Sequence, residues 1–150
     1  MTAKAAQSET WSTMLIGRWE QTGQKLATLA EAIPEEKYES KPVDGVRTAG
    51  DVLRHVAFWN QYVADTARGK KAEEAANELP KAKYATKTKI IDALKRSADE
   101  ATVALKEHQG SLDLKTAEMV GVFIEHTSEH YGQLAVYSRL NGIVPPASRG

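Results

Sequence analysis

Apolar side chains recur at steps of three, four and seven residues along four segments of the chain, with polar side chains between them. The segments cover residues 11–33, 52–63, 91–105 and 119–137. A period near 3.6 residues gathers apolar side chains on one face of a helix, so the pattern predicts four amphipathic helices. Their expected apolar faces are Trp11, Met14, Leu15, Trp19, Leu26, Leu29 and Ile33; Val52, His55, Val56, Trp59 and Val63; Ile91, Leu94, Ala98, Ala101 and Leu105; and Met119, Phe123, His126, His130, Leu134 and Tyr137.

Local signals predict where these helices begin and end. Pro34 ends the first helix, because the residue before a proline is disfavoured in the helical region. Thr48 is a suitable N-cap for the second helix. Gly110 ends the third. The fourth is expected to begin near Thr116 and to end at the Asn-Gly pair of residues 141–142.

The links between the helices predict how they are arranged. No segment alternates with a period of two, so we expect an all-α four-helix bundle without a sheet. The short link between the third and fourth helices favours antiparallel neighbours. The link between the second and third, about 15 residues, could span roughly 50 Å, whereas a helix of about 20 residues is about 30 Å long. A long crossover would leave these two helices parallel, in a single domain covering residues 1–150.

Charge and hydropathy limit the possible partners. Lysine plus arginine and aspartate plus glutamate each number 20. This balance does not indicate the strongly basic surface that nucleic-acid-binding proteins usually have. The polar first ten residues do not resemble a signal peptide, and no run of 18 apolar residues predicts a membrane span. We therefore expect a cytoplasmic protein that binds neither nucleic acid nor membrane.

Three of the four histidines fall on the predicted core-facing stripes. His126 and His130 are four residues apart, which places two imidazoles one above the other on a helix face. A single histidine such as His55 on an apolar stripe is usually an ordinary core residue. Together, the three could form a three-nitrogen metal site with open coordination positions. Because the chain has no cysteine, a metal would be held by nitrogen and oxygen. His108, at the end of the third helix, is expected to bond free carbonyls there.

Glu129 gives residues 126–130 the pattern H-x-x-E-H, which is also found in inverted zinc proteases. Those proteases are larger α/β enzymes with a further ligand well downstream, and only 20 residues follow His130. We therefore reject the protease interpretation. Glu129 could flank the metal site or be exposed to solvent, and we favour exposure.

Other side chains have both a functional and a structural interpretation. Gln133 could hydrogen-bond a ligating histidine or be an ordinary surface residue. Arg139 could pair with an acidic substrate, although a role at the end of the fourth helix is favoured. Trp59 and Tyr137 could line a pocket, but an aromatic residue on such a stripe usually belongs to the core.

Two segments resemble the DinB superfamily of metalloenzymes, and the similarity extends over nearly the whole chain. Residues 47–60, RTAGDVLRHVAFWN, are similar to the family's second helix with its single histidine. Residues 126–146 contain H-x-x-x-H-x-x-Q followed by arginine and glycine. The resemblance implies an up-down-down-up bundle, often a homodimer. It also implies a divalent metal, commonly nickel or zinc, bound by His55, His126 and His130.

The resemblance leaves three functional hypotheses open. The first is a metal-dependent enzyme that transfers a low-molecular-weight thiol, such as bacillithiol or mycothiol, or hydrolyses a small substrate. The second is a non-catalytic module that binds a metal or a small molecule. The third is a structural dimeric bundle with degenerate histidines.

Overall fold

The computed structural model describes residues 3–108 and 110–150, which form an all-α four-helix bundle as predicted. The helices are α1 (Ala3–Ala32), α2 (Ala49–Ala67), α3 (Lys87–Lys106) and α4 (Leu114–Leu140). Short 3₁₀ helices follow α1 and α4: η1 (Glu35–Lys37) and η2 (Pro146–Ser148).

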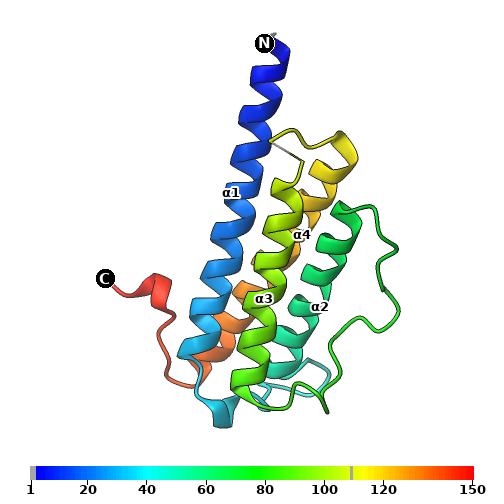
Figure 1. Ribbon diagram of the computed structural model, residues 1–150. Coiled ribbons are helices and arrows are strands. Elements are labelled where there is room, and N and C mark those ends of the chain that lie inside the picture. The colour runs from blue at the N-terminus through cyan, green and yellow to red at the C-terminus, as the bar shows by residue number, and fades with distance from the viewer. Residues whose placement is uncertain (1–2, 109) are drawn as a thin grey trace.

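Helices α2 and α3 run parallel to each other and opposite to α1 and α4 (Figure 1). This confirms the up-down-down-up order. Each long helix packs against two others: α2 and α1 both contact α3 and α4. The crossover, residues 68–86, runs along the outside of the bundle back to the end where α2 began (Figure 1).

Side-chain caps begin three of the helices. The Thr48 hydroxyl accepts a hydrogen bond from the Asp51 N–H, which confirms the predicted start of α2. Thr86 caps α3 in the same way. Helix α4 begins two residues before the predicted Thr116, because the Asp113 carboxylate accepts the Thr116 N–H at 2.8 Å. An aspartate suits this position, since it satisfies a free N–H and complements the helix dipole.

The core consists of aliphatic side chains from all four helices, including the fully buried Leu26, Val56 and Leu134. Trp11, predicted to be in the core, is 61% exposed. The next residue, Ser12, is buried, and its hydroxyl accepts a hydrogen bond from the Leu112 N–H at 2.9 Å. At this level, therefore, α1 packs through the face that carries Ser12 rather than the face that carries Trp11. On α3 the buried face is centred on Ile90 rather than on the half-buried Ile91. Within the described residues, no helix combines the length and the apolar character needed to cross a lipid bilayer.

The guanidinium of Arg54 is completely buried and joins three parts of the chain. It donates hydrogen bonds to Asp51 on α2, to Glu39 in the loop after α1 and to the Tyr84 carbonyl in the crossover. Burial opposes ionisation of Asp51, but hydrogen bonds from Arg54 and Thr48 hold its pKa below the usual value. A buried cation is tolerated only when it is paired in this way.

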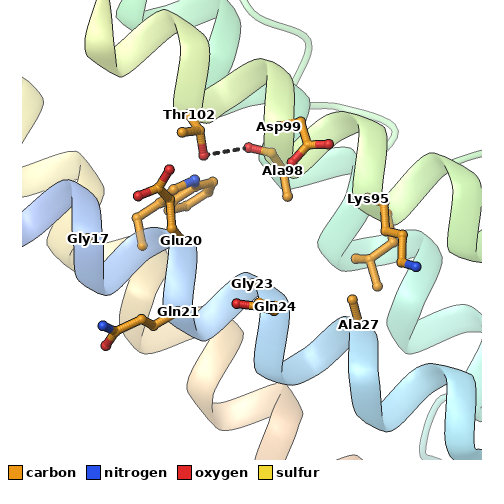
Figure 2. A pocket seen from close by; sticks show the side chains of 12 residues that line it. Gly17, Glu20, Gln21, Gly23, Gln24, Ala27, Lys95, Ala98, Asp99 and Thr102 are labelled. Atoms are coloured by element: carbon orange, nitrogen blue, oxygen red, sulfur yellow. Dashed lines mark hydrogen bonds between the residues drawn. The ribbon is translucent and has the colours of Figure 1, made fainter.

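A groove of about 570 Å³ lies between α1 and α3 (Figure 2). It exists because small residues face each other across the two helices, with Gly23 of α1 opposite Ala98 of α3. None of the three histidines lines this groove. They lie instead on α2 and α4.

Replacing Arg54 with alanine should lower the free energy of unfolding by about 3–5 kcal/mol, the typical cost of breaking a buried ion pair. Asp51 and Glu39 would lose their common partner. Urea denaturation followed by circular dichroism measures the change. The matched control is Arg68→Ala, which removes an exposed ion pair with Glu107 and should leave stability nearly unchanged. Equal effects of the two substitutions would contradict this role for Arg54.

Candidate metal centre

The structure brings the three predicted histidines together. His55 lies on α2, and His126 and His130 lie one turn apart on the neighbouring helix α4. Their potential ligand nitrogens are all within 4.8 Å of one another. The Nε2 atoms of His55 and His126 are only 2.9 Å apart. Metal binding itself stays a prediction, but the geometry that it requires is present.

The crossover determines which nitrogen of His55 faces the cluster. The Nδ1 atom lies 2.6 Å from the Asn77 carbonyl oxygen, which can only accept a hydrogen bond. Nδ1 therefore carries the proton, and the lone pair of Nε2 points toward His126. Asn77 has a φ of 56°, in the left-handed region that asparagine tolerates better than most residues. Its side-chain oxygen also accepts the indole N–H of Trp59 at 2.9 Å.

The residues after Asn77 attach the crossover to α2. Glu78 forms an ion pair with Arg47 at 3.6 Å. Leu79 is buried, and its N–H donates to the Arg54 carbonyl at 3.3 Å. These contacts hold the Asn77 carbonyl in place beside His55.

A chain of hydrogen bonds orients His130. The Tyr137 hydroxyl donates to the Arg47 carbonyl at 2.9 Å, so its oxygen accepts the Gln133 amide N–H. The Gln133 carbonyl oxygen then faces His130 Nδ1 at 2.9 Å and can only accept. His130 must carry its proton on Nδ1, which leaves the Nε2 lone pair free for a ligand. Such outer hydrogen bonds commonly orient metal-ligating histidines.

His126 of α4 faces His55 of α2, with ring centroids 4.9 Å apart. Its Nδ1 atom is buried and has no hydrogen-bond partner within the described residues. Its Nε2 faces the lone pair of His55 Nε2, so a proton or a cation must lie between them. Zinc–imidazole bonds are about 2.0–2.1 Å long, so one ion could contact both nitrogens. The three side chains therefore fit a divalent metal ion.

Burial keeps His55 and His126 neutral. Burial lowers the pKa of His55 to about 4, although its hydrogen bond to the Asn77 carbonyl acts in the opposite direction, and the nearby Arg47 lowers it further. Burial and the neighbouring histidines lower the pKa of His126 to about 3. Neutral imidazoles are the form that binds metals, since a protonated ring has no free lone pair.

The other candidates from the sequence have different outcomes. Gln133 contacts His130 directly. Glu129 is exposed, as favoured, and Arg139 is exposed in the last turn of α4. His108 does bond a helix-terminal carbonyl, but that carbonyl belongs to Ala67 of α2 rather than to its own helix.

Sequence reasoning missed Asn77 and Arg47 as parts of the site, and it considered Tyr137 only as a core or pocket-lining residue. The contacts of Asn77 arise in an irregular loop, where periodicity carries no information. Arg47 contributes a backbone carbonyl, which any residue type possesses. The one available signal was the spacing of Gln133 and Tyr137, three and seven residues after His130 and therefore on the same helix face.

Two comparisons with known proteins bear on these observations. The sequence profile of the DinB superfamily matches residues 18–134, well over half of the chain. The matched region contains all three histidines and Gln133. No curated protein matches the sequence.

The metal-free protein should lose stability as the pH falls from about 6.5 toward 4. In the unfolded chain, a histidine takes up a proton near its ordinary pKa of 6.5. In the folded protein, the pKa is about 4 for His55 and about 3 for His126, so both stay neutral to lower pH. Their contribution to stability is therefore complete above pH 6.5 and is lost as the pH falls through this window. Urea midpoints measured across the window in the presence of a chelator test this expectation.

Carboxylates also titrate in this range, so the comparison between variants is decisive. His126→Gln removes one titrating group and should show a shallower decline in urea midpoint. His108→Gln, which alters a histidine outside the cluster, should keep the wild-type slope. Identical slopes for all three proteins would contradict the low pKa assigned to His126.

Proposed function

Because the chain belongs to the DinB superfamily, we propose that it is a divalent-metal-dependent enzyme that transfers a low-molecular-weight thiol or hydrolyses a small substrate. The observation that carries the proposal is the cluster of His55, His126 and His130, two of which have their metal-binding nitrogen set by hydrogen bonds. Three imidazoles leave coordination positions for a substrate, in contrast to a closed structural site.

Nickel or zinc is the ion that we expect these residues to hold. Both bind imidazole nitrogen well, and the chain offers no thiolate as an alternative ligand. Three neutral ligands would leave the full positive charge of the ion in place. At such a site a bound thiol or water loses its proton near neutral pH.

The described residues would orient the reactants rather than take up their protons. The Nδ1 protons of His55 and His130 are committed to Asn77 and Gln133, so neither ring has a free basic nitrogen once it binds a metal. Glu78 is paired with Arg47. The proton released by a thiol or water would therefore pass to solvent, which the partly exposed His126 and His130 allow.

The same lack of a free base supports a second candidate, a non-catalytic metal or small-molecule binding module. Glu129 is exposed and is not part of the three-histidine group. A sensor or storage protein needs only the metal ligands and the hydrogen bonds that orient them. The two candidates therefore share a metal site and differ in turnover.

Cellular location and assembly follow as further proposals. We assign the protein to the cytoplasm, where small thiols are kept reduced. We also infer a homodimer. Large apolar side chains exposed on α1 and α4, including Met14, Val136 and Leu140, support this inference.

Purified protein incubated with mixed divalent metals and then desalted should retain nickel or zinc at close to one ion per chain. His126→Ala should lose most of this metal, because it removes one of three ligands. Plasma mass spectrometry measures the content of both proteins. His108→Ala is the matched control and should retain the wild-type amount, since His108 contacts the Ala67 carbonyl outside the cluster. Equal metal content in all three would refute the site and support a structural bundle.

Metal-loaded protein should turn over when electrophiles are offered with several cellular thiols, or when small hydrolysable esters and amides are supplied. The His55→Ala variant should lose this activity to near background, since it removes a ligand that the crossover positions. The assay follows thiol consumption and product formation with and without a chelator. Stoichiometric metal without turnover across the panel would favour the binding module.

A further inference from the structure

Three aromatic side chains adjoin the histidine cluster on one side. Trp59 and Tyr62 follow His55 on α2, and Phe123 precedes His126 on α4. Because α2 and α4 run antiparallel (Figure 1), residues after His55 and residues before His126 extend toward the same end of the bundle. The three rings therefore form one aromatic surface next to the proposed metal ion.

The rings are in mutual contact. Trp59 and Phe123 stack with centroids 5.5 Å apart and an interplanar angle of 26°. Tyr62 lies 5.2 Å from Trp59 and 5.5 Å from Phe123, measured between ring centroids. Phe123 also reaches the ring of His126 at 5.7 Å. The contacts bring the aromatic surface directly against one of the metal-binding side chains.

The aromatic surface is only half-buried, unlike the core of the bundle. Trp59, Tyr62 and Phe123 all remain partly accessible, whereas core residues such as Leu53 and Val63 are fully buried. The indole N–H of Trp59 donates to the Asn77 side-chain oxygen, which holds the ring in place. Accessible, rigid aromatic groups beside polar ligands are typical of small-molecule sites.

The opposite side of the cluster is polar. Gln133, Tyr137 and Arg47 lie there, connected by hydrogen bonds. The Arg47 side chain is 38% exposed and is close enough to lower the pKa of both His55 and His126. A ligand at the site would therefore meet positive charge from the ion, polar groups on this side, and an uncharged apolar surface beyond His126.

We propose that the substrate of this site carries a flat apolar group, such as an aromatic ring, adjacent to an anionic or ionisable reactive group. The reactive group meets the histidine-bound ion, and the flat group lies against Trp59, Tyr62 and Phe123. A cationic group is disfavoured, because it would approach the positively charged ion. This inference rests on the proposed function, since it places the reactive group at the metal.

Two hydroxamates that differ only in a flat group test the inference. Acetohydroxamate and benzohydroxamate both chelate through the same anionic group, and isothermal titration on metal-loaded protein gives their dissociation constants. Benzohydroxamate should bind the wild type about tenfold more tightly, a typical gain for an added aromatic contact. Phe123→Leu should abolish most of this preference, and Tyr62→Leu should reduce it.

Tyr131→Leu is the matched control. Tyr131 is a half-buried aromatic residue of the same helix, but its ring lies under Lys25 of α1, away from the cluster. This variant should keep the wild-type preference. An equal preference in the wild type and Phe123→Leu, with equal metal content, would overturn the inference while leaving the metal site intact.

A second readout does not depend on metal. Titration of metal-free protein with phenylacetate should shift the indole N–H resonance of Trp59, identified by its loss in Trp59→Phe, whereas acetate should not shift it. If the protein retains no metal, the proposed function fails, and this measurement alone decides whether the aromatic surface binds a flat group. An unchanged Trp59 resonance would then overturn the inference.

Discussion

The arrangement of α2, the loop after α1 and the crossover depends on the buried guanidinium of Arg54, which bonds all three. A cation without solvent must be surrounded by acceptors, and those acceptors come from segments far apart in the sequence. Glu39 and the Tyr84 carbonyl therefore lie beside the first turns of α2, where they accept hydrogen bonds from Arg54. The crossover that supplies Tyr84 also supplies Asn77, and Asn77 orients His55, the residue after Arg54. The geometry of the candidate centre thus depends on a charge that takes no part in its chemistry.

Two different parts of the fold orient the imidazoles of His55 and His130. His55 depends on a loop carbonyl, whereas His130 depends on side chains of its own helix that end at the Arg47 carbonyl. Arg47 also pairs with Glu78 of the crossover, so the two systems meet at one residue. A displacement of the crossover would therefore disturb two of the three ligands together. Such connected polar networks favour one arrangement of a site over many loosely similar ones.

Much of the fold could be predicted from the sequence because helices repeat their environment every few residues. The periodic apolar positions, the Thr48 cap and the i,i+4 pair of His126 and His130 are all local features. The exposure of Trp11 was predicted incorrectly, because the apolar pattern of a long helix does not reveal which face meets a neighbour at each level. The contact between Arg47 and Tyr137 joins residues 90 positions apart and depends on tertiary packing. Local patterns contain no information about such pairs.

The crossover combines segments with very different tolerance to change in length. Residues 70–76 are largely exposed and extend over the surface. Lengthening a flexible loop costs little entropy, about 0.6 kcal/mol for each doubling. The stretch from Asn77 to Leu79 has no such freedom, because one inserted residue would move either the carbonyl at His55 or the buried leucine out of register. Homologous chains could therefore differ widely in the outer part of the crossover, and a protein engineer could insert a peptide there, provided that these three residues keep their spacing from Tyr84.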